Sequence, residues 1–70
     1  MNIREFIKTI ELQRFMLGYG MLKFSKFLGI NYHTYNSFKK QDKRTQPKTI
    51  KILLEFALSK GIAIDTLDFY

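Results

Sequence analysis

The chain has 70 residues, no cysteine, one histidine, and twelve basic residues against six acidic ones, for a formal net charge of +6. This length predicts a single domain over residues 1–70, and the lack of cysteine excludes a disulfide framework or a thiolate metal site. Charges interrupt every apolar run, so we expect neither a signal peptide nor a membrane-spanning helix. A cytoplasmic protein without membrane contacts is the resulting expectation.

The first predicted helix covers residues 3–16. Asn2 can cap its start, because its side-chain oxygen can accept from a free backbone N–H of the first turn. The glycines at positions 18 and 20 end it, since glycine adopts turn and left-handed conformations at low cost. Its apolar side is formed by residues spaced three and four apart: Ile3, Phe6, Ile7, Ile10, Leu12, Phe15 and Met16.

The stretch 21–40 predicts two short helices, 21–28 and about 32–40, joined at Gly29. Asn31 stands where the second of these helices needs an N-cap. Its buried face carries Tyr35 and Phe38. Its other face is polar and consists of Tyr32, His33, Asn36, Ser37 and Lys40. A short helix of this kind, held by a preceding helix, can present side chains to a groove.

Residues 41–46 are polar and predict a loop, and Pro47 suits the first turn of a further helix over about 47–59. Thr45 or Gln46 stands at the capping position, and Gly61 ends the helix. The residues expected on its buried side are Ile50, Leu53, Leu54, Ala57 and Leu58. The apolar segment 62–70 is compatible with a short helix, a strand or an arm, and with a dimer or partner contact.

The positive charge is concentrated in one part of the chain. Residues 21–48 contain seven basic residues and only one acidic residue, Asp42, so they hold the whole excess of +6. Clustered positive charge beside a polar helix face is the pattern that a phosphate backbone requires. A solvated basic surface is the alternative that charge alone leaves open.

The spacing of Ser25, Gly29 and Tyr35 resembles the helix-turn-helix family of phage lambda repressor and Cro, the Xre type. In that pattern a small residue lets two helices approach, glycine makes the turn, and an aliphatic residue is buried where this chain has the bulkier Tyr35. The resemblance implies an all-α, compact bundle of four to five helices with its helix-turn-helix at about 21–40. The family commonly has glutamine, glutamate and glycine where this chain has Met21, Lys39 and Gln41.

The resemblance also implies which residues meet DNA. Those expected to contact bases are Tyr32, His33, Asn36, Ser37 and Lys40. Those expected to contact the DNA backbone are Lys23, Lys26, Asn31, Lys39, Lys43, Arg44 and Lys48. Asparagine can bind adenine through two hydrogen bonds, and lysine can reach guanine or a phosphate. No catalytic group, cofactor or metal is expected, because no nucleophile or carboxylate cluster accompanies the single histidine.

Two functions are compatible with these observations. The first is a sequence-specific regulator of the phage Cro/repressor type in a bacterial or phage-infected host cell, which blocks transcription by occupying its operator as a homodimer. The second is an antirepressor or modulator that binds a partner repressor through the same fold. A set of six phenylalanines could be read as a base-stacking platform, but helical spacing favours the core: Phe6, Phe15, Phe24, Phe27, Phe38 and Phe56. For Phe27 an outward position beside the motif is left open.

Overall fold

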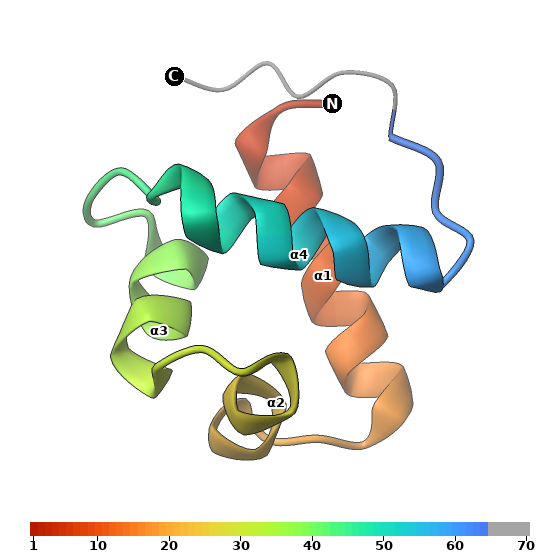
Figure 1. Ribbon diagram of the computed structural model, residues 1–70, viewed down its shortest axis with the longest axis horizontal. Helices are drawn as coiled ribbons and strands as arrows, with labels where there is room; N and C mark the ends of the chain where they lie inside the picture. The colour runs from red at the N-terminus through yellow and green to blue at the C-terminus, as the bar shows by residue number, and fades with distance from the viewer. Residues whose placement is uncertain (65–70) are drawn as a thin grey trace.

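A computed structural model describes residues 1–64, and these residues form an all-helical fold without a strand (Figure 1). The helices are α1 (Ile3–Leu17), α2 (Met21–Leu28), α3 (Tyr32–Lys40) and α4 (Pro47–Ser59). All four predicted helices are confirmed, and only the end of α1 differs from its prediction, by one residue. Residues 62–64 are not helical. Residues 65–70 lie outside the described part of the chain, and with them most of the segment 62–70 that was compatible with a short helix, a strand or an arm and with a dimer or partner contact.

The helix ends follow from the residues at them. The side chain of Asn2 accepts a hydrogen bond from the Glu5 N–H at 2.9 Å, and that of Asn31 accepts from the His33 N–H at 2.7 Å. Gly29 ends α2 in the left-handed region with φ +77°, where a Cβ atom would be strained. Gln46 precedes α4 without a side-chain capping bond, and Pro47 occupies the first turn.

Gln41 is the unusual helix end, because it occupies the left-handed region without being glycine. Its φ is 55° and its backbone N–H donates to the Ser37 carbonyl. Its side-chain amide donates to the Phe38 carbonyl at 2.8 Å and to Thr45 Oγ1 at 3.1 Å. These bonds hold the start of the 41–46 loop against the end of α3, and so offset the cost of the backbone conformation.

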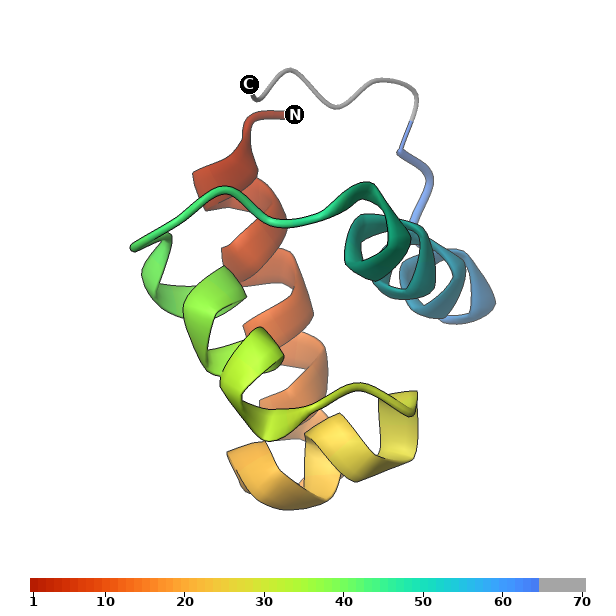
Figure 2. The same ribbon diagram turned by 60° about the vertical axis from the view of Figure 1, so that its left-hand side comes forward.

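The four helices enclose one aromatic core. Figure 1 shows α4 crossing over α1, and Figure 2 shows α3 alongside α1 with α2 closing the lower end of both. The rings of Phe6 and Phe38 meet edge to face with centroids 5.8 Å apart, which joins α1 to α3. The fully or almost fully buried apolar residues come from every helix: Phe6, Ile10, Phe24, Tyr35, Phe38, Leu53, Phe56 and Ala57.

The α2–α3 junction has the close packing that its sequence predicts. Ser25 is only 1% exposed, and its hydroxyl donates to the Leu22 carbonyl at 2.8 Å, which satisfies the buried oxygen within its own helix. Its small side chain lets α3 approach α2. The Phe24 and Tyr35 rings then meet across the junction at 5.4 Å in an edge-to-face contact.

Several residues predicted to be in the core are exposed instead. On α1, Leu12, Phe15 and Met16 are 57%, 78% and 70% exposed. The reason is the helical repeat: the side of α1 that faces the core continues from Phe6 and Ile10 to Arg14, so the three apolar residues point away from it. The prediction was also wrong for Leu58 on α4, which is 59% exposed, whereas Phe27, for which an outward position was left open, is 54% exposed.

The helices are also short. Among residues 1–64, none of them combines the length and the apolar character that a membrane span requires.

Candidate functional site

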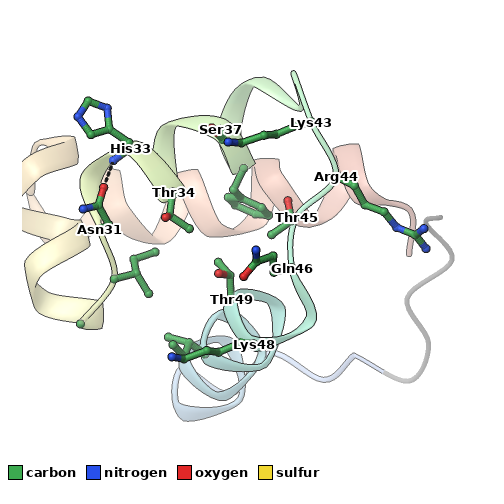
Figure 3. A pocket seen from close by; sticks show the side chains of 14 residues that line it. Asn31, His33, Thr34, Ser37, Lys43, Arg44, Thr45, Gln46, Lys48 and Thr49 are labelled. Carbon is green, nitrogen blue, oxygen red and sulfur yellow. Dashed lines mark hydrogen bonds between the residues drawn. The ribbon is translucent and has the colours of Figure 1, made fainter.

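A groove of about 420 Å³ lies between α3, the 41–46 loop and the first turn of α4 (Figure 3). The apolar side chains that line it are Ile30, Phe38 and Ile52, and most of the other lining residues are polar. Six residues that the sequence assigned to DNA contacts line it: Asn31, His33, Ser37, Lys43, Arg44 and Lys48. The fold thus brings together residues that lie up to 17 positions apart in sequence, from Asn31 before α3 to Lys48 in the first turn of α4.

Hydroxyl and amide groups line the groove on both sides. Figure 3 shows Gln46 and Thr49 side by side at the start of α4 and Thr34 across from them on α3, while the His33 ring and the Arg44 side chain point away from the groove. These three polar residues were not predicted as site residues. Thr34 could have been found from the sequence, since it lies one helical turn before Ser37 on the same side of α3. Gln46 and Thr49 could not, because their place depends on how α4 packs.

The predicted base-contacting residues separate into two rows on α3. His33 and Ser37 line the groove, and they are four positions apart as one helix face requires. Tyr32, Asn36 and Lys40 repeat at the same interval and form a row outside the groove. Tyr32 and Lys40 are exposed and Asn36 is half-buried. The Tyr32 and His33 rings meet edge to face at 5.5 Å, so the two rows adjoin at the start of α3.

The predicted backbone-contacting residues also occupy different places. Lys43 and Lys48 are exposed at the groove, on either side of the segment that enters α4. Lys23 and Lys26 are exposed on α2, and the Lys23 ammonium lies 4.6 Å from the centre of the Tyr19 ring. Positive charge is therefore exposed on α2 as well as at the groove.

Lys39 is placed apart from the other lysines. Its ammonium lies 3.5 Å from a carboxylate oxygen of Glu11 and 3.6 Å from the Met21 sulfur. It does not line the groove, and it faces α1 rather than the polar rows of α3. The structure thus gives Lys39 an internal contact that the sequence prediction did not include.

Glu11 is the centre of a polar cluster that fixes α3 against α1. Tyr35 Oη donates to Glu11 Oε2 at 2.5 Å, and Arg14 donates to the two carboxylate oxygens at 2.8 and 3.0 Å. Arg14 also donates to the Tyr19 carbonyl at 2.7 Å, which ties the α1–α2 turn to the cluster. The orientation of α3, and hence of its exposed rows, depends on these bonds.

The cluster changes the acidity of its members. Burial disfavours the Glu11 carboxylate, but the hydrogen bonds of Arg14 and Tyr35, with the charges of Arg14 and Lys39, outweigh it and lower the pKa of Glu11. Burial, with the Glu11 hydrogen bond, raises the pKa of Tyr35. Glu11 therefore stays ionised and Tyr35 stays protonated at neutral pH.

The 1–64 segment contains no group of three or more metal-ligating side chains. Comparison of the chain with models of protein families, with curated proteins and with solved structures finds no match.

Proposed function

We propose that α2 and α3 form a helix-turn-helix and that the chain is a sequence-specific DNA-binding regulator of the phage Cro/repressor type. One observation carries the proposal: the exposed polar rows of α3 adjoin a polar groove that Lys43 and Lys48 line, and two further lysines, Lys23 and Lys26, are exposed on α2. Such a regulator would block transcription in a bacterial or phage-infected cell by occupying its operator.

The local structure supports this reading of α2 and α3. The buried Ser25, the left-handed Gly29 and the buried Tyr35 occupy the places that a helix-turn-helix requires for close approach, turn and packing. Tyr35 is larger than the aliphatic residue usual there, and its hydroxyl finds a partner in Glu11 rather than remaining unsatisfied.

The two groups of residues have different roles in the proposed complex. Side chains of the α3 rows read base edges, with Asn36 able to bind adenine through two hydrogen bonds. Lys43, Lys48 and the α2 lysines hold phosphates, which sets orientation and supplies affinity without reading sequence. Because phosphate contacts release counterions, the affinity falls steeply as salt rises.

The experiment that tests the proposal is selection of bound fragments from random double-stranded DNA by the full chain at about 100 mM salt. We expect enrichment of one sequence, and a gel shift that favours it over scrambled DNA by on the order of a thousandfold. A gel shift of similar strength on every sequence would reduce the proposal to non-specific binding. No shift at low salt would overturn it.

A second function is favoured by a separate observation. Leu22 and Phe27 are more than half exposed on α2, beside Lys23 and Lys26. Exposed apolar side chains flanked by lysines suit an acidic protein surface better than a phosphate backbone. An antirepressor that binds a partner repressor would use such a surface. The absence of any enriched DNA, together with a stable complex with a repressor encoded nearby, would favour this function.

A further inference from the structure

The outward face of α1 is apolar in the C-terminal half of the helix, and the packing of residues 1–64 leaves it exposed. Leu12, Phe15 and Met16 recur at intervals of three and four, so they form one continuous side of the C-terminal half of the helix. They lie opposite the buried Phe6 and Ile10. Isolated exposed apolar residues are common, but three adjoining large ones on one helix face are typical of an interaction surface.

Charge identifies the kind of partner that this face can accept. The helix α1 carries three basic and two acidic residues, and Glu11 and Arg14 are already paired. The segment 21–48, which spans α2 and α3, holds the whole excess of +6. Two copies of the chain repel each other wherever these segments meet, whereas two α1 helices can approach with little repulsion. The exposed apolar residues of α2, Leu22 and Phe27, lie beside lysines, so two copies that met through them would repel each other.

The face also permits self-association without blocking the groove, because none of the groove-lining residues belongs to α1. A pair related by a two-fold axis would place the same three residues of each copy in one interface, as symmetric homodimers do. We propose that the outward face of α1, formed by Leu12, Phe15 and Met16, is the contact through which two copies of this chain form a homodimer.

The area of the face indicates a weak pair. A large side chain has roughly 150–250 Å² of surface and these three are 57–78% exposed, so the six side chains of two copies bury about 600–1,000 Å² in total, below the ~1,200 Å² of stable complexes. The homodimer is therefore weak and concentration-dependent, and it dissociates at submicromolar concentration. Burial of apolar surface drives it, so added salt does not weaken it.

Sedimentation equilibrium of the full chain, from about 5 μM to about 1 mM and at about 0.1 and 0.5 M salt, tests this contact. We expect the mass to rise from monomer to dimer at both salt concentrations. The variant Phe15→Gln/Met16→Gln should weaken the dimer by about tenfold or more. Leu22→Gln/Leu58→Gln is the matched control, because it also replaces two exposed apolar residues and should leave the dimer unchanged.

Circular dichroism of both double variants shows whether they keep the helical content of the original chain, which we expect since all four residues are more than half exposed. A chain that stays monomeric at the highest concentration overturns the proposal, as does a control variant that dissociates as readily as Phe15→Gln/Met16→Gln. Dissociation by 0.5 M salt of the original chain also overturns it, because an interface of that kind would be electrostatic. None of these measurements requires DNA, so the result does not depend on the proposed function.

Discussion

Tyr35 Oη donates a 2.5 Å hydrogen bond to the carboxylate of Glu11, and this bond joins α3 to α1 across 24 positions of the chain. Tyr35 is 0% exposed, so its hydroxyl needs a hydrogen-bond acceptor inside the fold, and Glu11 provides one. Glu11 in turn depends on Tyr35 and Arg14, because burial disfavours its charge. The two side chains are therefore complementary, and a change in either should affect the stability of the whole fold.

Replacing Tyr35 with phenylalanine tests this relationship. The variant keeps the ring packed against Phe24 but removes the hydrogen bond, so Glu11 loses one of its donors. We expect a loss of about 1–3 kcal/mol in the free energy of unfolding, the range for bonds to charged groups. Urea unfolding measures it. Tyr32→Phe is the control, because the exposed Tyr32 has no such bond, and an equal effect in both variants would contradict the assignment.

The acidity of Glu11 predicts a dependence of stability on pH. Its pKa in the folded chain lies below the ordinary value of 4.5, so its carboxylate stabilises the fold at higher pH. That contribution is lost as the pH falls through the folded-state pKa. We expect the free energy of unfolding to decrease as the pH falls below about 4.5, and Glu11→Gln to flatten this decrease. Urea titrations at several acid pH values would show it. A pH profile identical in the variant and the original chain would contradict the prediction.

The cluster also shows what the sequence could and could not predict. Helix bounds followed from local patterns, since the spacing of Phe6 and Ile10, the cap Asn31 and the turn at Gly29 each act within a few residues. The pairing of Glu11 with Tyr35 and Lys39 depends on how α1 and α3 meet, which no local pattern contains. For the same reason the sequence did not predict that Lys39, which it assigned to the DNA backbone, pairs with Glu11.

The wrong prediction that Leu12, Phe15 and Met16 of α1 belong to the core has a different physical cause. Apolar residues in the C-terminal half of α1 occupy two sides of the helix, and an apolar count alone does not say which side is buried. The side that carries Arg14 and Leu17 continues the buried line of Phe6 and Ile10, so Phe15 is exposed. A period of 3.6 residues applied strictly from Phe6 and Ile10 would have excluded Phe15 from the core.

Gln41 offers a test of backbone strain at the end of α3. Gln41→Gly and Gln41→Ala both remove the side-chain bonds to Phe38 and Thr45, but only alanine keeps a Cβ atom in the left-handed region. We expect the glycine variant to be more stable than the alanine variant by about 1 kcal/mol. Thermal or urea unfolding of the pair measures the difference. Equal stability would mean that the left-handed conformation at this position carries no cost.

The proposed roles in DNA binding can be separated by two substitutions. Asn36→Ala removes a proposed base contact, so we expect a loss of about 1–3 kcal/mol on the selected sequence and little change on random DNA. Lys43→Ala removes a proposed phosphate contact at the groove, so it should weaken binding to all sequences alike and lower the salt slope by about one. Gel shifts on both DNAs over a range of salt measure these effects. The same loss on both DNAs for both variants would contradict the division of roles.

Lys39→Ala is the matched comparison for Lys43→Ala, because each variant removes one positive charge and the two positions are only four residues apart. The Lys39 ammonium faces Glu11 at 3.5 Å and lies outside the groove, whereas Lys43 lines it. We therefore expect Lys39→Ala to leave the salt slope of DNA binding unchanged. Its effect on the free energy of unfolding should be below about 1 kcal/mol, because the ion pair is partly exposed. If Lys39→Ala lowers the salt slope as much as Lys43→Ala does, Lys39 contacts a phosphate in the complex and its bond to Glu11 is broken on binding.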